Sequence, residues 1–349
     1  MRNRTPDEVP HRCRQRLLAH YGPDAERWLD GAPGLLKEAA DRWRLSLADY
    51  HDIGHASVIT VATDLDGRPL LLKAWPDPIR YRREMSALRL WARGPTAGVI
   101  ESADDLAVAA LELVGGRAGG AERPEREIPM VAAALHGLHT VGRRRRRQAS
   151  GFPLLTDHLG EEMLPRMRRR AQQLDTSPWR PLVDAGLAVL SELEPDASRA
   201  TVLHADLYRE NVLFDRAICT RFIDPLPMAG DAVYDWAFWT VYYTLGQGTD
   251  SRLAMASRIS RIPVPELAPW CRALALDGLL SYLESDDPRA QEMAGVLGSL
   301  SAHGGGADST SRPSSSPGDP SSSGAVEGPA VATVGPVIHP PETKDPRHA

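Results

Sequence analysis

The stretch from Val202 to Trp239 constrains this chain more than any other part of the sequence. It reads V-L-H-A-D-L-Y-R-E-N-V-L-F-D, then a short connection, then R-F-I-D-P-L-P-M-A-G-D-A-V-Y-D-W-A-F-W. Three polar residues, Asp206, Asn211 and Asp224, stand within otherwise apolar sequence. The apolar pieces beside them predict short strands that hold these polar side chains at their tips.

These three residues have the chemistry and spacing expected for phosphoryl transfer. Asn211 and Asp224 offer the hard oxygen ligands that Mg²⁺ prefers, and Asp206 would orient an attacking hydroxyl group and accept its proton. Lys73, predicted near the end of a separate strand, would neutralise a nucleotide's phosphates, with Glu84 on the next helix as its partner. Lys73 or Glu84 alone is typical of a solvated surface charge. Their combination with the main stretch favours a phosphotransfer site.

Composition and charge exclude several other classes of protein. The chain of 349 residues has a net charge of −5, so no overall basic field favours nucleic acid or an anionic membrane. No apolar run approaches the roughly 20 residues of a membrane span, and the N-terminus has no apolar signal core. Three cysteines without C-x-x-C spacing predict neither a disulfide framework nor a zinc site. We therefore expect a cytoplasmic monomer that binds neither nucleic acid nor membrane.

The first half of the chain predicts a helical segment followed by a small sheet. Residues 8–46 have apolar side chains at helical spacing, with breaks expected at Gly22-Pro23 and from Gly31 to Gly34. The elements predicted after this segment are a strand around residues 58–61, a hairpin turn at Asp66-Gly67, a returning strand at 70–75, a helix at 79–91 and a buried strand at 107–114.

The Gly-rich stretch from Gly115 to Pro124 predicts a boundary between a small lobe and a larger helical lobe. Helices are expected at residues 128–140, 164–174 and 181–193, and again after the main stretch to about Leu300. The arginines from Arg143 to Arg147 predict a solvated loop or a contact with an anionic ligand. The expected parts are a helical segment (1–50), a nucleotide-binding lobe (51–115), a catalytic and substrate-binding lobe (116–302) and a disordered tail rich in Ser, Pro and Gly (303–349).

The main stretch resembles the aminoglycoside phosphotransferase family, and within it the streptomycin 6-kinase and hydroxyurea phosphotransferase branch. That branch carries H-G-D-L-H-x-x-N-V-L followed by I-D-P-x-P-x-x-G-D-x-x-[YF]-D. The corresponding segments here are H-A-D-L-Y-R-E-N-V-L from His204 and I-D-P-L-P-M-A-G-D-A-V-Y-D from Ile223. The segments A-E-R-W-L, L-L-K-E-A-A-D-R-W and R-x-E-x-x-A-L-R-L-W also resemble this branch, so the likeness covers about residues 8–300.

The resemblance implies an α+β fold of the protein-kinase type, with a small lobe built on an antiparallel sheet and a larger, mostly helical lobe. It implies Asp206 as the catalytic base, Asn211 and Asp224 as Mg²⁺ ligands, and Lys73 with Glu84 at the phosphates of ATP or GTP. The strand ending at Glu112 and Leu113 would be the hinge that meets the adenine through backbone groups. Asp231 and Asp235 would be structural, with a helix N-cap as an alternative for Asp231.

The chain departs from the family pattern at three places. Ala205 replaces a glycine, which is costly only where φ is positive, and Tyr208 replaces a histidine. The phosphate loop, D-I-G-H-A-S-V from Asp52, has Gly54 as its only glycine. Gly54 and Ser57 are small enough to approach a phosphate, and Ser57 would donate a hydrogen bond, although a plain tight turn is the alternative.

The expected activity is transfer of phosphate from ATP or GTP to a hydroxyl group of a streptomycin-type aminoglycoside, which inactivates the antibiotic. Alternatives are the same chemistry on hydroxyurea or another hydroxylated metabolite, and a nucleotide-binding pseudokinase. A polycationic substrate predicts an acidic pocket in the larger lobe. The acidic residues available for it are Glu266, Asp277, Glu284, Asp286 and Asp287.

Overall fold

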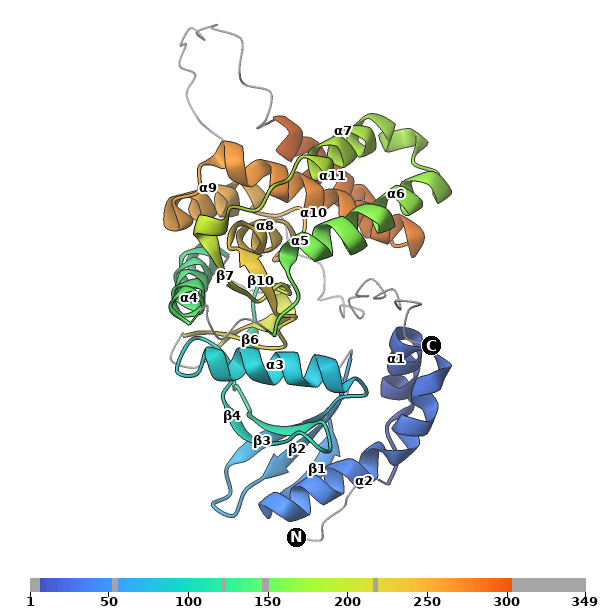
Figure 1. Cartoon of the computed structure of the whole chain (residues 1–349), viewed down its shortest axis with the longest axis vertical. Coiled ribbons are helices and arrows are strands. Elements are labelled where there is room, and N and C mark those ends of the chain that lie inside the picture. The colour runs from blue at the N-terminus through green and yellow to red at the C-terminus, as the bar shows by residue number, and fades with distance from the viewer. Residues whose placement is uncertain (1–6, 52–55, 121–123, 146–150, 216–218, 303–349) are drawn as a thin grey trace, which may run out of the picture.

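The chain forms two lobes of the expected α+β type, seen one above the other in Figure 1. The computed structural model describes residues 7–51, 56–120, 124–145, 151–215 and 219–302. Gly54 and the tail that we predicted to be disordered lie outside the described residues.

The N-terminal lobe is built on a five-stranded antiparallel sheet in the order β1-β2-β3-β5-β4. The central strand β3 pairs with β2 on one side and β5 on the other, and Lys73 lies opposite Ile59 and Ala109. The predicted hairpin turn is confirmed, because Gly67 has a φ of 80° between β2 and β3. The strands are β1 (Ser46–Tyr50), β2 (Val58–Thr63), β3 (Pro69–Ala74), β4 (Val99–Ala103) and β5 (Val108–Glu112).

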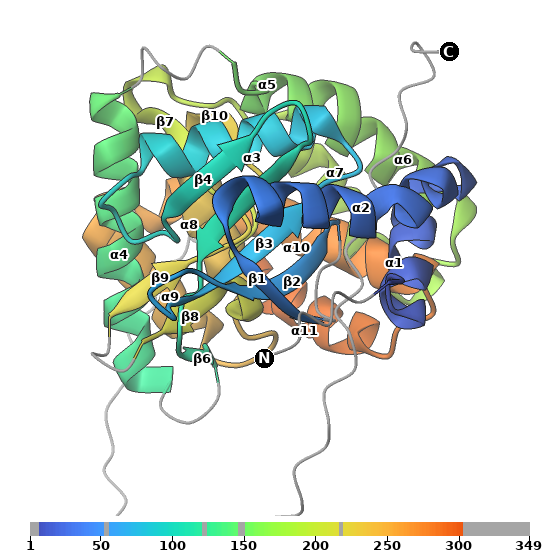
Figure 2. The same cartoon turned by 90° about the horizontal axis from the view of Figure 1, so that it is seen from below.

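The two faces of this sheet are covered by different helices. Leu70, Leu72 and Ala74 of β3 pack with α1 (His11–Tyr21) and α2 (Glu26–Trp43), and Figure 2 shows α2 running across the sheet. Because side chains alternate along a strand, Leu71 and Lys73 face the opposite side. That side is covered by α3 (Pro78–Leu90), which lies between the sheet and the second lobe (Figure 1).

The break that we predicted between Gly31 and Gly34 is wrong, because α2 is continuous from Glu26 to Trp43. The helix buries Leu29, Ala32 and Leu36 against the sheet, and burial of an amphipathic face outweighs the low helix propensity of glycine. The other expected break is confirmed, since α1 ends at Tyr21 and Gly22 has a φ of 79°.

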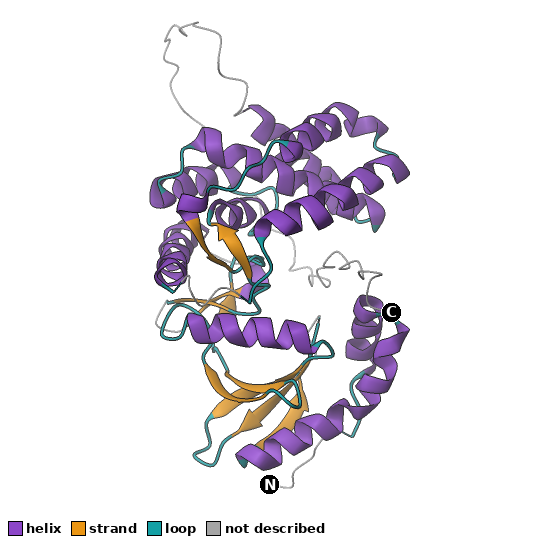
Figure 3. Ribbon diagram, in the orientation of Figure 1, coloured by secondary structure: helices purple, strands orange, loops and turns teal. Residues whose placement is uncertain are grey.

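The C-terminal lobe is mostly helical and has two small sheets, and Figure 3 shows most of its helices above these strands, with α4 beside them. Its centre is α10, which is buried along most of its length. The helices are α4 (Pro124–Arg144), α5 (Leu155–Asp157), α6 (Leu164–Gln173), α7 (Arg180–Ser191), α8 (Val233–Tyr242), α9 (Thr249–Ser260), α10 (Val264–Glu284) and α11 (Arg289–Ala302). The strands are β6 (Arg117–Ala118), β7 (Ala200–Leu203), β8 (Val212–Phe214), β9 (Thr220–Phe222) and β10 (Met228–Asp231).

The helices predicted at residues 128–140, 164–174 and 181–193 correspond to α4, α6 and α7. Of the arginine run, Arg145 donates from Nη1 to the carbonyl oxygen of Leu90 at 2.7 Å and so links the end of α4 to α3. Within the described part of the chain, no helix is long and apolar enough to cross a membrane.

Candidate active site

Two short antiparallel pairs hold the polar residues of the main stretch. Strand β7 pairs with β10, and β8 pairs with β9. Asp206 and Asn211 lie in the connection from β7 to β8, and Asp224 lies between β9 and β10. The N–H of Ile223 donates to the carbonyl oxygen of Asn211 at 3.0 Å and joins the two connections. The strands therefore place the three polar residues at their ends, as the sequence predicted.

Asp206 is a buried carboxylic acid, with 5% of its surface exposed. The side-chain amide of Asn211 donates to its Oδ2 at 2.9 Å and to its carbonyl oxygen at 3.0 Å. Burial raises the pKa of Asp206 to about 8, against the opposing charge of Arg80. A group with this pKa is suited to accept a proton at slightly alkaline pH.

Lys73 connects the two lobes through two carboxylates. Its Nζ lies 2.8 Å from Oε1 of Glu84 on α3 and 2.9 Å from Oδ1 of Asp224 in the C-terminal lobe. Burial alone would lower the pKa of Lys73, but the two carboxylates more than offset this and raise it. Lys73 therefore stays an ammonium ion at neutral pH despite being 5% exposed.

Trp75 is a part of this centre that the sequence did not reveal. Its indole Nε1 donates to Oε2 of Glu84 at 2.9 Å, and Nζ of Lys73 lies 4.8 Å from its ring centroid. Trp75 is two residues after Lys73 and therefore on the same side of the chain. That spacing was the one available signal, and Trp75 was predicted only as the end of a strand.

His204 orients the loop that carries Asp206 and remains neutral. A carbonyl oxygen only accepts, so Nε2 carries the proton that His204 donates to Ile223 at 3.0 Å. Its Nδ1 then accepts from the N–H of Asp206 at 3.3 Å. Burial lowers the pKa of His204 to about 4, so the imidazole is uncharged and joins the loop of Asp206 to the segment of Asp224.

Asp235, on α8, lies beneath the loop that carries Asp206 and is fully buried. Its carboxylate accepts from the N–H groups of His204 and Ala205, both at 2.8 Å, and lies 2.9 Å from Nε2 of His139. Ala205 has a φ of 58°, so its methyl group is in the conformation where it costs free energy. Asp224 also has a positive φ, 53°, and such strain is typical of functional sites.

Asp231 accepts from the N–H of Val233 at 2.9 Å, but Ala232 occupies the N-cap position of α8, so Asp231 lies one residue before the N-cap that was its alternative role. It also accepts from Arg199 Nη2 at 2.8 Å. Both contacts are structural.

The predicted hinge residues lie at the connection between the lobes. The N–H of Glu112 donates to the carbonyl oxygen of Gly98 at 2.8 Å, and its carboxylate accepts from Gly98 and Arg221. The N–H of Glu112 is therefore engaged within the protein and is not available to an adenine. Leu113 follows β5 and is half-buried, and Ser57, just before β2, is buried.

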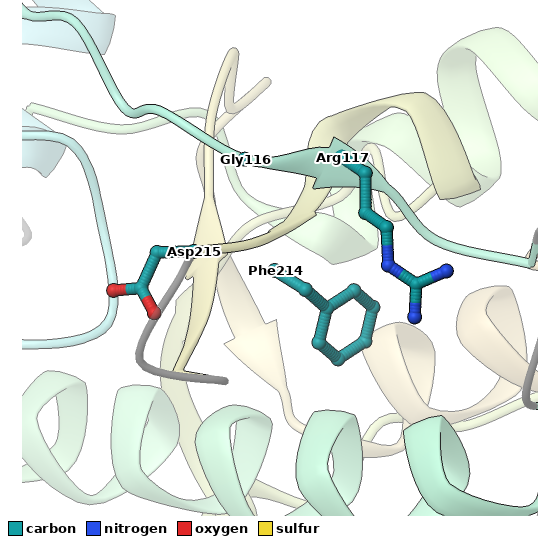
Figure 4. Close-up of a pocket in the computed structure, with 4 residues that line it drawn as sticks. All are labelled: Gly116, Arg117, Phe214 and Asp215. Carbon is teal, nitrogen blue, oxygen red and sulfur yellow. The ribbon is translucent and has the colours of Figure 1, made fainter.

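A solvent-open pocket of about 430 Å³ lies just beyond this hinge, where β6 pairs with β8 (Figure 4). Gly116, Arg117, Phe214 and Asp215 line it. Gly116 has a φ of 155°, and a Cβ there would lie 2.3 Å from the carbonyl oxygen of Phe214, so this close approach requires glycine. The pocket shares no lining residue with the centre around Lys73 and Asp206.

The acidic residues from which we expected a pocket for a polycation lie mostly in ion pairs. Asp277 is 2.9 Å from Arg166 and 3.4 Å from Arg170. The further pairs are Glu266 with Arg199, Glu284 with Arg170 and Asp287 with Arg289, whereas Asp286 is exposed. These arginines reduce the negative charge that the sequence alone suggested.

Tyr208, at the position where the resembling branch has histidine, packs its ring against α8. The centroid distances are 5.1 Å to Phe238 and 5.2 Å to Tyr242. Tyr208, which follows Asp206 by two residues, therefore belongs to an aromatic cluster with Phe238 and Tyr242.

The amide oxygen of Asn211 and the carboxylate of Asp224 fit a magnesium site of the kind completed by phosphates and water. Asn211 directs its amide nitrogen at Asp206, and Asp224 has 42% of its side chain exposed. The described residues contain no group of three His, Cys, Asp or Glu side chains arranged around a metal, which Mg²⁺ bound mainly through a nucleotide does not need.

The sequence profile of one protein family, described as aminoglycoside/hydroxyurea antibiotic resistance kinase, matches residues 42–262. The chain belongs to this kinase family. The matched region covers more than half of the chain and includes Lys73, Glu84, Asp206, Asn211 and Asp224. The kinase is therefore a phosphotransferase with a hydroxyl group as acceptor.

Characterised relatives of the kinase agree with this family. This chain is 25% identical over 233 residues to streptomycin 6-kinase of Streptomyces griseus, and the aligned region covers 65% of this chain and 72% of that protein. It is 27% identical over 232 residues to hydroxyurea phosphotransferase of Kitasatospora aureofaciens, covering 65% of this chain and 66% of that protein.

Solved structures show the same fold at lower identity. A macrolide 2'-phosphotransferase from Brachybacterium faecium is 17% identical with a TM-score of 0.55, covering 80% of the kinase and 99% of that chain. An aminoglycoside phosphotransferase in a ternary complex with ADP and hygromycin B is also 17% identical with a TM-score of 0.55, covering 77% and 98%. At these identities the likeness concerns the fold.

Proposed function

We propose that this protein transfers the terminal phosphate of ATP or GTP, with Mg²⁺, to a hydroxyl group of a streptomycin-type aminoglycoside, which would inactivate the antibiotic. The observation that carries this proposal is the pairing of Lys73 with both Glu84 and Asp224 across the two lobes, next to the Asp206–Asn211 contact. Charges that are 151 residues apart in sequence meet at one point, in the arrangement that phosphoryl transfer uses.

In this proposal Asp206 orients the acceptor hydroxyl and takes its proton as the bond to phosphorus forms. Asn211 holds Asp206 through the 2.9 Å contact and, with Asp224, would hold Mg²⁺. Mg²⁺ would supply positive charge that offsets the charge of the nucleotide's phosphates. Lys73 would turn from Asp224 toward these phosphates while Glu84 keeps its ammonium in position. Ser57 and the loop with Gly54 would approach the phosphates, and Leu113 would meet the base.

We propose the same division of the chain that the sequence indicates. Residues 51–115 would bind the nucleotide, residues 116–302 would carry the catalytic loop and the acceptor site, and residues 1–50 would support the first lobe.

A second candidate substrate is a small neutral hydroxyl compound such as hydroxyurea. The paired acidic residues favour it, because Asp277 and Glu284 share Arg170 and present less negative charge to a polycation. The aromatic cluster around Tyr208 also suits a neutral or partly apolar acceptor. The relative named hydroxyurea phosphotransferase supports this alternative.

An assay of nucleotide turnover over a panel of acceptors tests the proposal and separates the two candidates. Streptomycin, hydroxyurea, hygromycin B and a macrolide would each be incubated with enzyme, Mg²⁺ and either ATP or GTP, and ADP or GDP release would be followed. Turnover with streptomycin at least tenfold above the rate without acceptor supports the preferred substrate. Turnover with hydroxyurea alone selects the second candidate. Nucleotide binding without turnover of any acceptor would indicate a pseudokinase.

A further inference from the structure

The face of α3 that carries Glu84 also carries Arg80, one helical turn nearer the start of the helix. Residues four apart lie on the same side of a helix, so Arg80 faces the space between the sheet and the second lobe. Arg80 is half-buried, whereas Arg82 and Arg83 on the same helix are exposed. A half-buried arginine so close to Lys73 and Glu84 was not singled out by any sequence pattern.

The last turn of α1 contacts this arginine from outside the sheet. Nη1 of Arg80 lies 3.4 Å from Nε2 of His20, and because a guanidinium only donates, the histidine accepts. The next residue, Tyr21, donates its hydroxyl proton to the carbonyl oxygen of Ala56 at 2.8 Å. Ala56 precedes Ser57, so one turn of α1 contacts both α3 and the described end of the phosphate loop.

The charge of Arg80 acts on carboxyl groups in both lobes. Burial raises the pKa of Asp206 and of Glu84, and the positive charge of Arg80 works against that increase at both. Among the charged groups that act on Asp206, Arg80 has the largest effect. A guanidinium that influences Glu84 in one lobe and both Asp206 and Asp224 in the other lies close to the space between the lobes.

A nucleotide would bring more negative charge into a centre that already contains an excess of it. Glu84 and Asp224 outnumber Lys73 even while Asp206 is protonated. These carboxylates would repel a polyphosphate unless further positive charge were present. The phosphate loop contains a single glycine, and an arginine offers five N–H donors in a fork that matches phosphate oxygens.

We propose that Arg80 is a second phosphate-binding cation of this kinase, whose guanidinium contacts the nucleotide's terminal phosphate beside Lys73 while the last turn of α1 keeps it in position. This role rests on the proposed phosphotransfer function. The N-terminal helical segment then contributes to the nucleotide site as well as to packing.

Substitution of Arg80 tests this role, with Arg82→Gln as the matched control from an exposed position of α3. Arg80→Gln is expected to lower kcat/KM for ATP about 100-fold, in the range found on removal of one charge-stabilising donor. Arg80→Lys is expected to have a kcat/KM for ATP at least tenfold higher than that of Arg80→Gln. KM for the acceptor and the unfolding temperature are expected to change little, and Arg82→Gln to match the wild type within twofold.

Binding of ATP measured by calorimetry without acceptor separates the possible failures. Unchanged ATP affinity and kcat/KM in Arg80→Gln, in an active wild type, would overturn the role of Arg80 alone. A wild type that binds no ATP would overturn the proposed function with it. If Arg80→Gln does not fold, His20→Gln provides the test: a severalfold higher KM for ATP is expected, and an unchanged value contradicts the inference.

Discussion

Asp206 is the residue whose surroundings most alter its chemistry. Burial raises its pKa to about 8, so at pH 7 most molecules carry the protonated form, which cannot accept a proton. We predict that kcat/KM for the acceptor rises about tenfold per pH unit up to about pH 8 and levels off above it. Initial rates between pH 6 and 9.5 with saturating Mg²⁺ and ATP measure this. A flat profile from pH 6 to 9 would show that Asp206 is not the proton acceptor.

Ala205 occupies a conformation that glycine adopts more easily, since its φ is 58°. Alanine in place of the branch's glycine therefore strains the loop. The strained conformation is stabilised by Asp235, which accepts hydrogen bonds from the N–H groups of His204 and Ala205. Ala205→Gly is expected to increase the free energy of unfolding by about 0.5–1 kcal/mol, because relief of strain exceeds the added chain entropy of glycine. Urea unfolding at pH 7 measures the change. A loss of stability would mean that the methyl group contributes more by packing than it costs in strain.

Strand β3 alternates its side chains so that Lys73 and Trp75 meet Glu84 on α3. Trp75→Phe keeps most of the packing and removes the one indole donor to Oε2 of Glu84. We predict a loss of about 1–3 kcal/mol in the free energy of unfolding, the usual cost of a buried acceptor left without a partner, and a severalfold higher KM for ATP. Denaturant unfolding and initial rates check both values. Trp28→Phe, in a half-buried part of α2, is the control, and equal effects in both variants would remove Trp75 from the site.

Helix α2 remains continuous through the exposed glycines Gly31 and Gly34. Because glycine has a low helix propensity, the stability of this helix comes mainly from its packing against the sheet. A Cβ added at Gly34 would meet no atom within 4 Å. Gly34→Ala is therefore predicted to stabilise the protein by about 0.5–1 kcal/mol through better helix propensity. Gly116→Ala is the contrasting variant, because its Cβ would lie 2.3 Å from a backbone oxygen, and we expect it to destabilise. Thermal unfolding of the two variants compares them, and a lower melting temperature for Gly34→Ala would contradict the helix argument.

At the scale of the whole molecule, the elements with strong local signals were predictable. The hairpin of β2 and β3 and the helix α3 follow from alternating apolar residues, Asp66-Gly67 and helical spacing. Strands β1 and β4 were not predicted, because they have few buried positions and acquire their conformation by pairing with β2 and β5. Long-range pairing of this kind leaves little trace in local sequence.

The candidate site was predictable in its polar residues and less so in what surrounds them. The meeting of Lys73, Glu84 and Asp224 confirms the expected proximity of these side chains, while their chemical roles remain proposals. The contacts of Trp75, Arg80 and His139 depend on packing between segments that are distant in sequence. No residue spacing in the sequence reveals this packing. The ion pairs of the C-terminal lobe were missed for the same reason, since Arg166 and Asp277 are 111 residues apart.

The central claim is that the Asp206 centre transfers phosphate from a nucleotide to a hydroxyl group. Mass spectrometry of streptomycin and hydroxyurea after incubation with Mg²⁺ and ATP or GTP tests it most directly, using the wild type and Asp206→Asn side by side. The account predicts a mass gain of one phosphate on one acceptor with the wild type, and a rate lower by about 10²–10⁴-fold with Asp206→Asn. Equal phosphorylation by both proteins would contradict it.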